Sequence, residues 1–229
     1  MGYEAERRQM VENQLVRRGI ADPLVLAAMA KVAREKFLPT SVRHRAYVDG
    51  PLPIGGGQTI SQPYVVALMI AALELGGGDN VLEIGTGSGY SAAVLGEIAE
   101  TVQTVERLRA LAESARHTLQ GLGYGNVHVH CGDGSLGLAA RAPFDAIVVT
   151  AGGPAIAGPL RDQLAPGARL VMPVGRRRTS QRLVRLRRTG PEPGDFEEEV
   201  LARVRFVPLI GRRGWPATGT RWVPSRRTR

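Results

Sequence analysis

The chain has 229 residues, a mass of 24.6 kDa and a formal net charge of +9, and 43% of its residues are hydrophobic. This length suits one compact domain that buries most of its apolar surface. No apolar run reaches the roughly 18 residues of a membrane span, and the charged N-terminal segment does not resemble a signal peptide. We therefore expect a cytoplasmic protein with no membrane contact. The single Cys131 and four scattered histidines predict neither an internal disulfide nor a metal site.

The positive charge is concentrated near the C-terminus. Residues 1–45 carry a net charge of +4, residues 46–175 carry −5 and residues 176–229 carry +10. A basic region of this kind can bind nucleic acid, but a solvated surface or a loose tail explains it more often. Only Lys31 and Lys36 among the 30 basic residues are lysines, which indicates a compositional bias towards arginine. We expect no nucleic-acid partner and a monomeric protein.

The first third of the chain predicts helices around a long loop. Residues 4–18 predict a helix that stops at Gly19, and residues 23–37 predict a second helix. Residues 39–63 are rich in glycine and proline, and loops of this length inside a compact domain are usually functional. Residues 63–75 are almost wholly apolar and predict a buried helix.

From residue 79 onward, predicted strands and helices alternate. The strands are expected near residues 81–84, 102–106, 127–131, 144–150 and 169–174, and the helices near 91–98, 109–122 and 156–164. Such alternation predicts an α/β fold with a doubly wound, mostly parallel, Rossmann-like sheet and helices on both faces. Two further strands, near 182–187 and 199–206, predict an antiparallel hairpin at the sheet edge, which brings the sheet to seven strands.

This pattern gives one domain with three parts. We expect N-terminal helices and a loop over residues 1–78, a cofactor-binding core over 79–175 and edge strands over 176–215. The basic tail over 216–229 shows no periodicity, and we expect it to lack regular structure.

The most informative segment is a glycine turn between the first core strand and its helix. Gly85, Gly87 and Gly89 remove side chains where the backbone bends and approaches a ligand. The second strand ends at Glu106, about 20 residues after the turn, where a carboxylate can accept hydrogen bonds from both ribose hydroxyls. A nucleotide cofactor is therefore expected at this turn.

Two departures from the dinucleotide pattern select the cofactor. Tyr90 stands where a dinucleotide fingerprint has its last glycine, and Glu83 is an acid placed just before the turn. A carboxylate suits the ammonium and sulfonium groups of S-adenosyl-L-methionine and does not suit a pyrophosphate. The segment resembles the first motif of S-adenosylmethionine-dependent methyltransferases. The expected cofactor residues in this part of the chain are Glu83, Gly85, Thr86, Gly87, Ser88, Gly89 and Glu106.

A second acidic turn follows the third core strand. Gly132, Asp133 and Gly134 place one carboxylate between flexible glycines, which suits a hydrogen bond to the adenine amino group. The spacing fits a simple Asp-Gly turn equally well.

The loop before the apolar helix points to the methyl acceptor. Ser61 is placed to cap that helix, and the free amides of a helix N-terminus flanked by the Thr59 and Ser61 hydroxyls form a ready site for a carboxylate. An anionic acceptor is therefore expected.

Four segments together resemble the protein-L-isoaspartate O-methyltransferase family, in order from about residue 4 to Trp215. They are Pro51-Leu52-Pro53-Ile54-Gly55, Gln58-Thr59-Ile60-Ser61-Gln62-Pro63, the glycine turn from Leu82 to Tyr90, and Val207-Pro208-Leu209. The resemblance implies methyl transfer from S-adenosylmethionine to the α-carboxylate of isoaspartyl residues in damaged proteins and peptides, followed by collapse of the ester to a succinimide. Ser61 matches the active-site serine of the family, and Thr59 is expected to assist it. The expected substrate-binding residues are Gln58, Ile60, Thr150, Val207, Pro208 and Leu209.

The residue inventory agrees with this chemistry. An α-carboxylate with a reference pKa of about 3.3–3.7 is already ionised at neutral pH, so no general base is needed, and Ser61 and Thr59 would orient the acceptor. Three features depart from the family pattern: Gly56, the glycine-rich segment 151–153 and the arginine-rich end from Gly219. We expect the first two to loosen the substrate entrance, and the third matches no role in the family.

Three other functions compete with this interpretation. The basic C-terminal third suggests an RNA methyltransferase. However, no signature of a base-amino methyltransferase follows the fourth strand, and Cys131 is followed by Gly132 and not by the proline of the Cys-Pro nucleophile in cytosine-carbon methyltransferases. A peptide-tailoring carboxyl methyltransferase would keep the same fold and chemistry. A non-catalytic cofactor-binding module is disfavoured because the cofactor and hydroxyl positions are intact.

Overall fold

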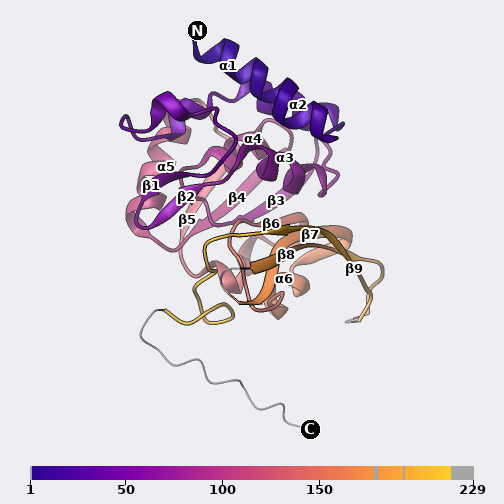
Figure 1. Cartoon of the computed structure of the whole chain (residues 1–229). Helices are drawn as coiled ribbons and strands as arrows, with labels where there is room; N and C mark the ends of the chain where they lie inside the picture. The colour runs from indigo at the N-terminus through magenta and orange to yellow at the C-terminus, as the bar shows by residue number, and fades with distance from the viewer. Residues whose placement is uncertain (1, 178–179, 193, 218–229) are drawn as a thin grey trace.

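The protein, described here from a computed structural model, forms a seven-stranded sheet with helices on both faces (Figure 1). The structure describes residues 2–177, 180–192 and 194–217, so Arg178 and the tail beyond 217 lie outside the described residues. The strand order is β5-β4-β3-β6-β7-β8-β9. This arrangement confirms the predicted doubly wound α/β fold, and the division at residues 78 and 175 stays a prediction.

The sheet is parallel from β5 to β7 and antiparallel beyond β7. Its strands are β3 (Asn80–Ile84), β4 (Thr101–Glu106), β5 (Val127–Cys131), β6 (Phe144–Val149), β7 (Leu164–Arg177), β8 (Ser180–Arg188) and β9 (Phe196–Val204). A separate antiparallel hairpin is formed by β1 (Leu52–Gly55) and β2 (Gln58–Ile60). The predicted edge hairpin is confirmed as β8 and β9.

Three helices from the N-terminal part of the chain lie over the sheet, with α1 and α2 at the top of Figure 1 and α3 below them beside α4. They are α1 (Tyr3–Met10), which continues through a π turn (Val11–Leu15) and a 3-10 turn (Val16–Arg18), α2 (Pro23–Lys31) and α3 (Pro63–Ala71). The core helices are α4 (Tyr90–Gly96), α5 (Arg109–Gly121) and α6 (Gly158–Asp162). The first helical segment ends, as predicted, at Gly19, which has a φ of 88°.

Successive residues of each strand point to opposite faces of the sheet and pack into two hydrophobic cores. On one face, Val81 and Val148 pack with the apolar sides of α2, α3 and α4. On the other face, Leu82 and Ile147 pack with Leu160 of α6. Because side chains alternate along a strand, the continuous apolar runs of these strands fill both layers, which is typical of a parallel sheet buried on both faces.

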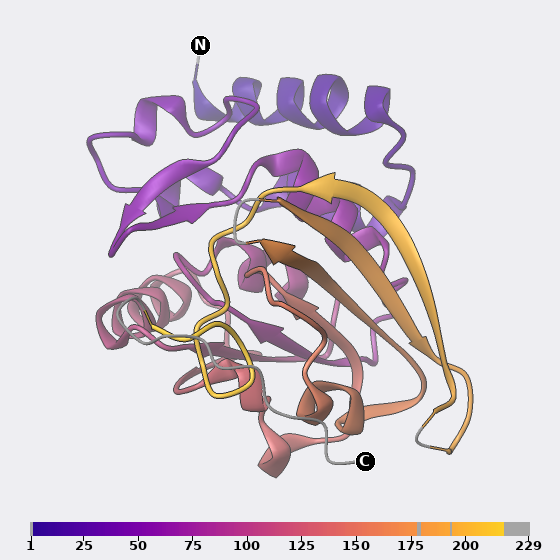
Figure 2. The same ribbon diagram turned by 60° about the horizontal axis from the view of Figure 1, so that its bottom comes forward.

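The winding of the sheet reverses between β3 and β6. From β3 the chain proceeds to β4 and β5 on one side, and β6 and β7 continue on the other side. In open α/β sheets, ligands bind beyond the carboxyl ends of the strands at such a reversal. Figure 2 shows the C-terminal segment after β9 passing over this end of the sheet.

Two element boundaries differ most from the prediction. The second helix ends at Lys31 instead of residue 37, because Val32 leaves the helix with a ψ of 118° and Arg34 and Glu35 turn into the interior as part of a 3-10 turn (Arg34–Phe37). The last core strand begins at Leu164, which pairs with Phe144 before a bulge that includes Gly167 with a φ of 79°. Proline and glycine at this bulge interrupt the apolar pattern, so the sequence did not predict where the strand begins.

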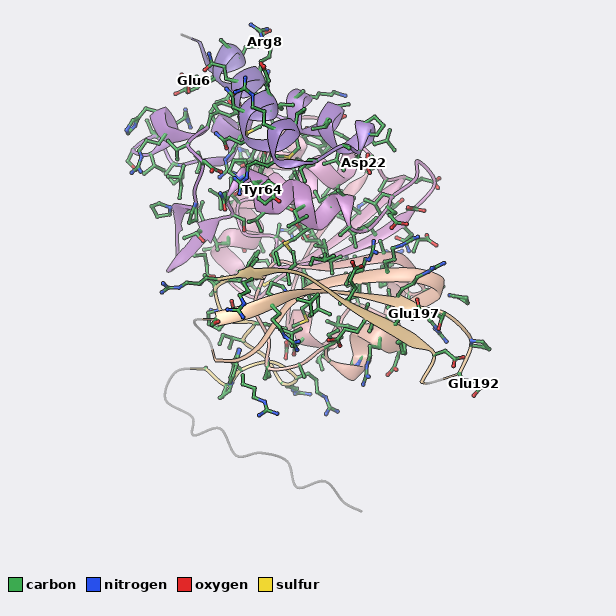
Figure 3. The ribbon with its side chains drawn as sticks, turned by 45° about the vertical axis from the view of Figure 1, so that its right-hand side comes forward. Glu6, Arg8, Asp22, Tyr64, Glu192 and Glu197 are labelled. Carbon is green, nitrogen blue, oxygen red and sulfur yellow. The ribbon has the colours of Figure 1, made fainter. Side chains whose placement is uncertain are left out.

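Charged side chains mark the two ends of the molecule. Glu6 and Arg8 on α1 lie far from Glu192 and Glu197 near the β8–β9 turn (Figure 3).

Tyr64 of α3 lies between these ends, and the Arg18 guanidinium carbon stacks 3.6 Å from its ring centroid.

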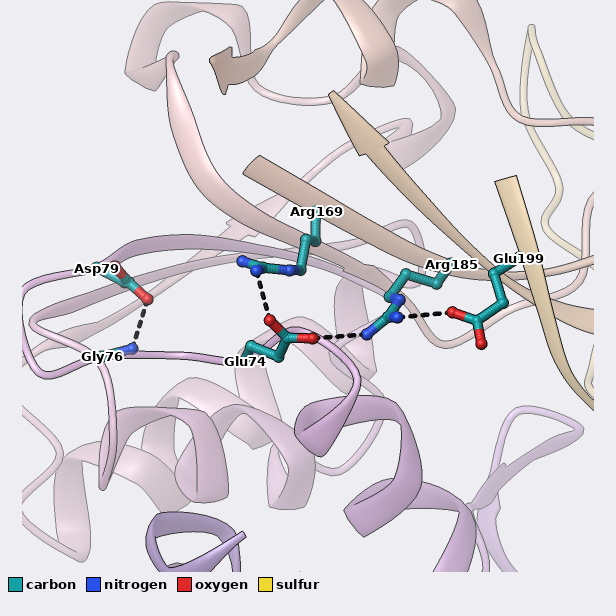
Figure 4. A network of polar contacts seen from close by, with 6 residues as sticks. All are labelled: Glu74, Gly76, Asp79, Arg169, Arg185 and Glu199. Atoms are coloured by element: carbon teal, nitrogen blue, oxygen red, sulfur yellow. Dashed lines mark hydrogen bonds and ion pairs between the residues drawn. The ribbon is translucent and has the colours of Figure 1, made fainter. Parts of the chain in front are cut away.

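One carboxylate connects the N-terminal layer to the edge strands (Figure 4). Glu74, in the loop after α3, accepts hydrogen bonds from Arg169 of β7 and, at 2.8 Å, from Arg185 of β8. Arg185 also pairs with Glu199 of β9 at 2.6 Å. Glu74 has a φ of 52°, an unfavourable value for a residue other than glycine, so its side-chain contacts hold a strained backbone in place.

We expect Glu74→Gln to destabilise the fold by about 0.5–1 kcal/mol, because Arg169 and Arg185 lose the charge that lies between them. The loss should shrink in 1 M NaCl, where screening weakens both the pairs and the repulsion that replaces them. Urea denaturation at low and high salt measures the effect. The control is Glu4→Gln, which breaks only the exposed pair with Arg8. An equal loss at both salt concentrations would contradict an electrostatic role.

Candidate active site

A cavity opens at the carboxyl ends of β3 and β6, where the winding reverses. Residues from six separate segments line it, and these include most of the predicted site residues. The predicted residues in the lining are Gln58, Thr59, Ile60, Ser61, Gly85, Thr86, Gly87, Ser88, Glu106, Gly134, Thr150, Val207, Pro208 and Leu209. The lining also includes residues that the sequence did not single out for this role: Val66, Met69, Ile84, Tyr90, Ser91, Val105, Arg107, Val148, Ala151 and Ile210. The glycine turn at residues 85–89, here called the cofactor loop, and the segment at residues 58–62, here called the acceptor loop, therefore face the same cavity.

The glycine turn requires glycine for two separate reasons. Gly85, Gly87 and Gly89 have φ values of 100°, 55° and 90°, which residues other than glycine rarely adopt. A Cβ atom on Gly85 would also collide with the Thr150 hydroxyl, which donates a hydrogen bond to the Gly85 carbonyl at 2.7 Å. Thr150 therefore holds the turn from the end of β6. Gly89 itself does not line the cavity; its role is to start α4.

Glu106 is positioned at the end of β4 by two backbone amides. Its carboxylate accepts hydrogen bonds from Gly87 N at 3.0 Å and from Leu108 N at 2.9 Å, and the residue is 6% exposed. Each carboxylate oxygen has a second lone pair. The side chain can therefore hold the glycine turn and still accept hydrogen bonds from a ligand.

Glu83 lies beneath the turn and not at its mouth. It is fully buried, faces the layer under α4 and does not belong to the cavity lining. One oxygen accepts a hydrogen bond from Thr104 Oγ1 at 2.6 Å, which is 2.6 Å from the Thr86 hydroxyl, while the other oxygen has no partner among the described residues. The alternation of side chains along β3 explains this position, because Ile84 takes the cavity side. A role of Glu83 towards the cofactor stays a prediction, and it would act through Thr104 and Thr86.

Burial raises the pKa of Glu83 to about 7, and the charge of Glu106 adds to this effect, whereas the hydrogen bond from Thr104 and the nearby Ser91 side chain oppose it. A buried carboxyl group near the cofactor end of the cavity therefore changes its charge close to neutral pH.

Asp133 is committed to the chain itself. Its Oδ1 accepts hydrogen bonds from the Ser135 amide at 3.0 Å and hydroxyl at 2.7 Å, and its Oδ2 accepts one from Arg212 N at 2.8 Å. Burial alone would raise the pKa of Asp133, but these three donors lower it below its usual value. The alternative of an Asp-Gly turn is confirmed in that Asp133 caps the 3-10 turn Gly134–Leu136. Gly132 and Asp133 do not line the cavity, and contact with adenine stays a prediction.

The acceptor loop joins β2 to α3. The predicted helix cap is wrong, because the N-cap residue of α3 is Gln62 and no side chain caps the helix. Proline at the first helical position removes one of the amides that a cap would serve. Ser61 is half-buried, Thr59 is exposed and both line the cavity, so the two hydroxyls are free of a structural duty as helix caps.

A C-terminal strap, residues 206–215, closes the other wall of the cavity. Gly152 donates to the Val207 carbonyl at 2.8 Å, and Leu209 donates back to the Gly152 carbonyl at 2.8 Å. The strap then folds on itself, since the Trp215 amide donates to the Leu209 carbonyl at 2.7 Å. The sequence offered no periodicity here beyond the family segment at 207–209.

Gly152 and Gly153 follow the end of β6 and face side chains of the neighbouring strands. A Cβ atom on Gly153 would collide with the Met172 side chain, and one on Gly152 would lie 3.0 Å from the Gln181 side chain. Both glycines therefore pack closely against β7 and β8, and the looser entrance expected from segment 151–153 stays a prediction.

Within the described ranges, no cluster of three potential metal-ligating side chains occurs. None of the helices in the same ranges combines the length and apolar character that a bilayer crossing needs. His128 and His130 lie on a partly exposed strand face, as expected.

The pKa of Glu83 makes stability depend on pH in a defined direction. Between its ordinary pKa of 4.5 and about 7, the unfolded chain releases a proton that the folded protein retains, so stability falls as pH rises through this window and levels off above it. The full difference corresponds to about 3 kcal/mol. We expect Glu83→Gln to remove this part of the pH dependence.

Urea denaturation at pH 5 and pH 8 measures the change. The control is Glu113→Gln, which alters an exposed carboxylate on α5 and should leave the pH dependence as it is. Identical pH dependence in the natural protein and in Glu83→Gln would show that Glu83 does not titrate in this window.

Comparison with known proteins places this cavity in a family. The model of the protein-L-isoaspartate(D-aspartate) O-methyltransferase family matches residues 5–214. A protein-L-isoaspartate O-methyltransferase of Rhodopseudomonas palustris strain HaA2 is 60% identical over 213 residues, covering 93% of this chain and 86% of the relative. One from Pelobacter propionicus is 58% identical over 212 residues, covering 93% of both chains.

Solved structures agree in fold. One protein-L-isoaspartate O-methyltransferase has a TM-score of 0.79 at 30% identity, over 91% of this chain and 67% of that chain. A putative one from Plasmodium falciparum, solved in complex with S-adenosyl-L-homocysteine, has a TM-score of 0.75 at 25% identity, over 89% of this chain and 98% of that chain. With its family match running from residue 5 to the end of the strap, the chain belongs to the protein-L-isoaspartate(D-aspartate) O-methyltransferase family.

Proposed function

We propose that the protein transfers a methyl group from S-adenosylmethionine to the free α-carboxylate of L-isoaspartyl residues in damaged proteins and peptides. The methyl ester then collapses to a succinimide, which hydrolyses in part to normal aspartate. One observation carries the proposal. The acceptor loop, the glycine turn and Glu106 line one cavity, in a chain that matches this family over residues 5–214.

The cofactor end of the cavity suits S-adenosylmethionine. Glu106 keeps free lone pairs for the two ribose hydroxyls, and the 85–89 turn leaves room for the methionine part beside the Thr86 and Ser88 hydroxyls. We assign the adenine to the neighbourhood of Gly134, with Asp133 as its predicted partner. When bound, the cofactor supplies an activated methyl group on a sulfonium.

The acceptor end needs to orient an anion. The substrate carboxylate is ionised at neutral pH, so its oxygen can attack the methyl carbon directly while the carbon–sulfur bond breaks and its electron pair stays on sulfur. We assign Ser61 and Thr59 to orienting this carboxylate by hydrogen bonds, near the free amides of α3. Alignment and exclusion of water can contribute at most roughly 7–11 kcal/mol to lowering the barrier.

The peptide around the isoaspartyl residue would contact the two walls beside these hydroxyls. Gln58 and Ile60 come from β2, Thr150 from the end of β6, and Val207, Pro208 and Leu209 from the strap. The strap residues that line the cavity, 207–210, are all apolar, which suits contact with a peptide more than with a nucleotide base.

Contacts of the basic third favour a protein substrate over nucleic acid. Arg185 pairs with Glu74 and Glu199, and Arg188 donates hydrogen bonds to the carbonyls of Leu164, Gly190 and Pro191. These arginines serve the fold and leave fewer free charges for phosphates. We also propose that the protein acts in the cytoplasm, where an unpaired Cys131 stays reduced, and as a monomer.

The assay offers labelled S-adenosylmethionine and two peptides that differ only in an aspartyl or an isoaspartyl linkage. We expect methyl incorporation into the isoaspartyl peptide alone. Ser61→Ala should lower kcat/KM on that peptide about 10–100-fold, the loss of one hydrogen bond to a charged group. Ser114→Ala, on the exposed face of α5, serves as the matched control.

Equal labelling of both peptides, or of neither, would overturn the proposed function. An unchanged rate in Ser61→Ala would remove that residue from the acceptor site while leaving the reaction itself in place.

A further inference from the structure

Arg34 is a cation that has no contact with either reactant in the proposed methyl transfer. It lies in the 3-10 turn after α2 and is 0% exposed. Arginine is almost never fully buried without a carboxylate partner. Among the described residues, no carboxylate lies within ion-pair distance of Arg34, and its Nη1 has no hydrogen-bond partner. The fold therefore keeps a charge in its interior with incomplete compensation.

The contacts of Arg34 come from three separate segments. Its Nε donates to the Ala46 carbonyl at 2.8 Å, and its Nη2 donates to the Ser61 carbonyl at 2.8 Å. Its guanidinium carbon lies 4.9 Å from the centroid of the Tyr90 ring. Ser61 belongs to the acceptor loop, and Tyr90 is the first residue of α4, directly after the cofactor turn.

A purely packing role accounts poorly for this choice of residue. A buried, unpaired charge is costly, and an apolar side chain of similar volume would fill the same space without an unsatisfied donor. The planar guanidinium fork, by contrast, fixes the relative positions of the groups that it contacts. The groups fixed here are the two halves of the reaction site.

We propose that Arg34 is a positioning residue for methyl transfer. By holding the Ser61 carbonyl against the start of α4, it sets the Ser61 hydroxyl and the N-terminus of α3 in line with the cofactor turn. The inference rests on the proposed function and deepens it, because it names what aligns acceptor and donor. Arg34 does not line the cavity, so it acts through Ser61 and Tyr90.

Arg34→Lys keeps the charge but gives up the fork. A single ammonium cannot hold the Ser61 and Ala46 carbonyls in the same geometry. We expect kcat on the isoaspartyl peptide to fall at least tenfold when it is normalised to the concentration of protein that binds S-adenosylmethionine. The dissociation constant of S-adenosylmethionine should change less than twofold. Arg34→Gln serves as a second variant if the lysine protein folds poorly.

Tyr47→Phe is the matched control. Tyr47 donates a hydrogen bond to Glu35 at 2.5 Å in the same N-terminal layer, but it touches neither Ser61 nor Tyr90 through any hydrogen bond or ring contact described here. Its removal should lower stability and leave kcat within twofold. A similar loss of kcat in Tyr47→Phe and Arg34→Lys would overturn the inference, because general loosening of the layer would then explain both.

A double-mutant cycle tests whether Arg34 acts through Ser61. The variant combining Arg34→Lys with Ser61→Ala should lose less activity than the product of the two single losses, because part of the effect of Arg34 passes through the Ser61 hydroxyl. Losses that multiply would show that the two residues act independently, and the positioning role would be wrong.

Hydrogen exchange provides a readout without catalysis. Amides of α3 should exchange faster in Arg34→Lys than in Tyr47→Phe, while those of β3 and β4 stay as in the natural protein. Unchanged exchange in α3 would overturn the inference. If the natural protein fails to methylate the isoaspartyl peptide, the proposed function is wrong, and exchange still decides whether Arg34 positions the acceptor loop.

Discussion

The hydrogen bond from the Gly87 amide to the Glu106 carboxylate joins the two chain segments that form the cofactor end of the cavity. It depends on the left-handed backbone of the turn, because only glycine places that amide towards the end of β4 without strain. The β1–β2 hairpin rests on the same two segments. A Cβ atom on Gly87 would lie 3.3 Å from Ile54, and one on Gly56 would lie 3.1 Å from Leu108. The acceptor loop that follows this hairpin is thus located by the cofactor loop.

Arginine has three distinct uses in this chain, although its abundance alone suggests only a basic surface. Arg34 is fully buried and crosses between loops. Arg185 links β8 to Glu74 and Glu199, and Arg188 closes the β8–β9 end by binding carbonyl oxygens. Only a guanidinium offers enough donors in one plane for such multiple contacts. The high arginine content of the C-terminal third therefore has a partly structural explanation.

The sequence predicted the layers of the fold and the general location of the site, because both follow from periodicity and glycine placement. Short apolar runs separated by helical segments predicted β3 to β6, and the glycine turn with Glu106 marked the carboxyl edge of the sheet. Long-range contacts could not be predicted in this way. The commitment of Asp133 to Arg212, nearly eighty positions later, has no local signal, and neither does the contact of Arg34 with Ser61. The depth of Glu83 depends on which face of β3 the winding covers, and that is a tertiary property.

The row of oxygens from Glu83 through Thr104 to Thr86 has a direction. With Glu83 ionised, Thr104 donates to Glu83 and Thr86 donates to Thr104, so both hydrogens point away from the cavity and Thr86 presents a lone pair to it. With Glu83 protonated, its carboxyl group can donate to Thr104, and Thr104 can then donate to Thr86. The Thr86 hydrogen becomes free to turn towards the ligand. One proton at a completely enclosed atom can therefore convert a hydrogen-bond acceptor on the cavity wall into a donor.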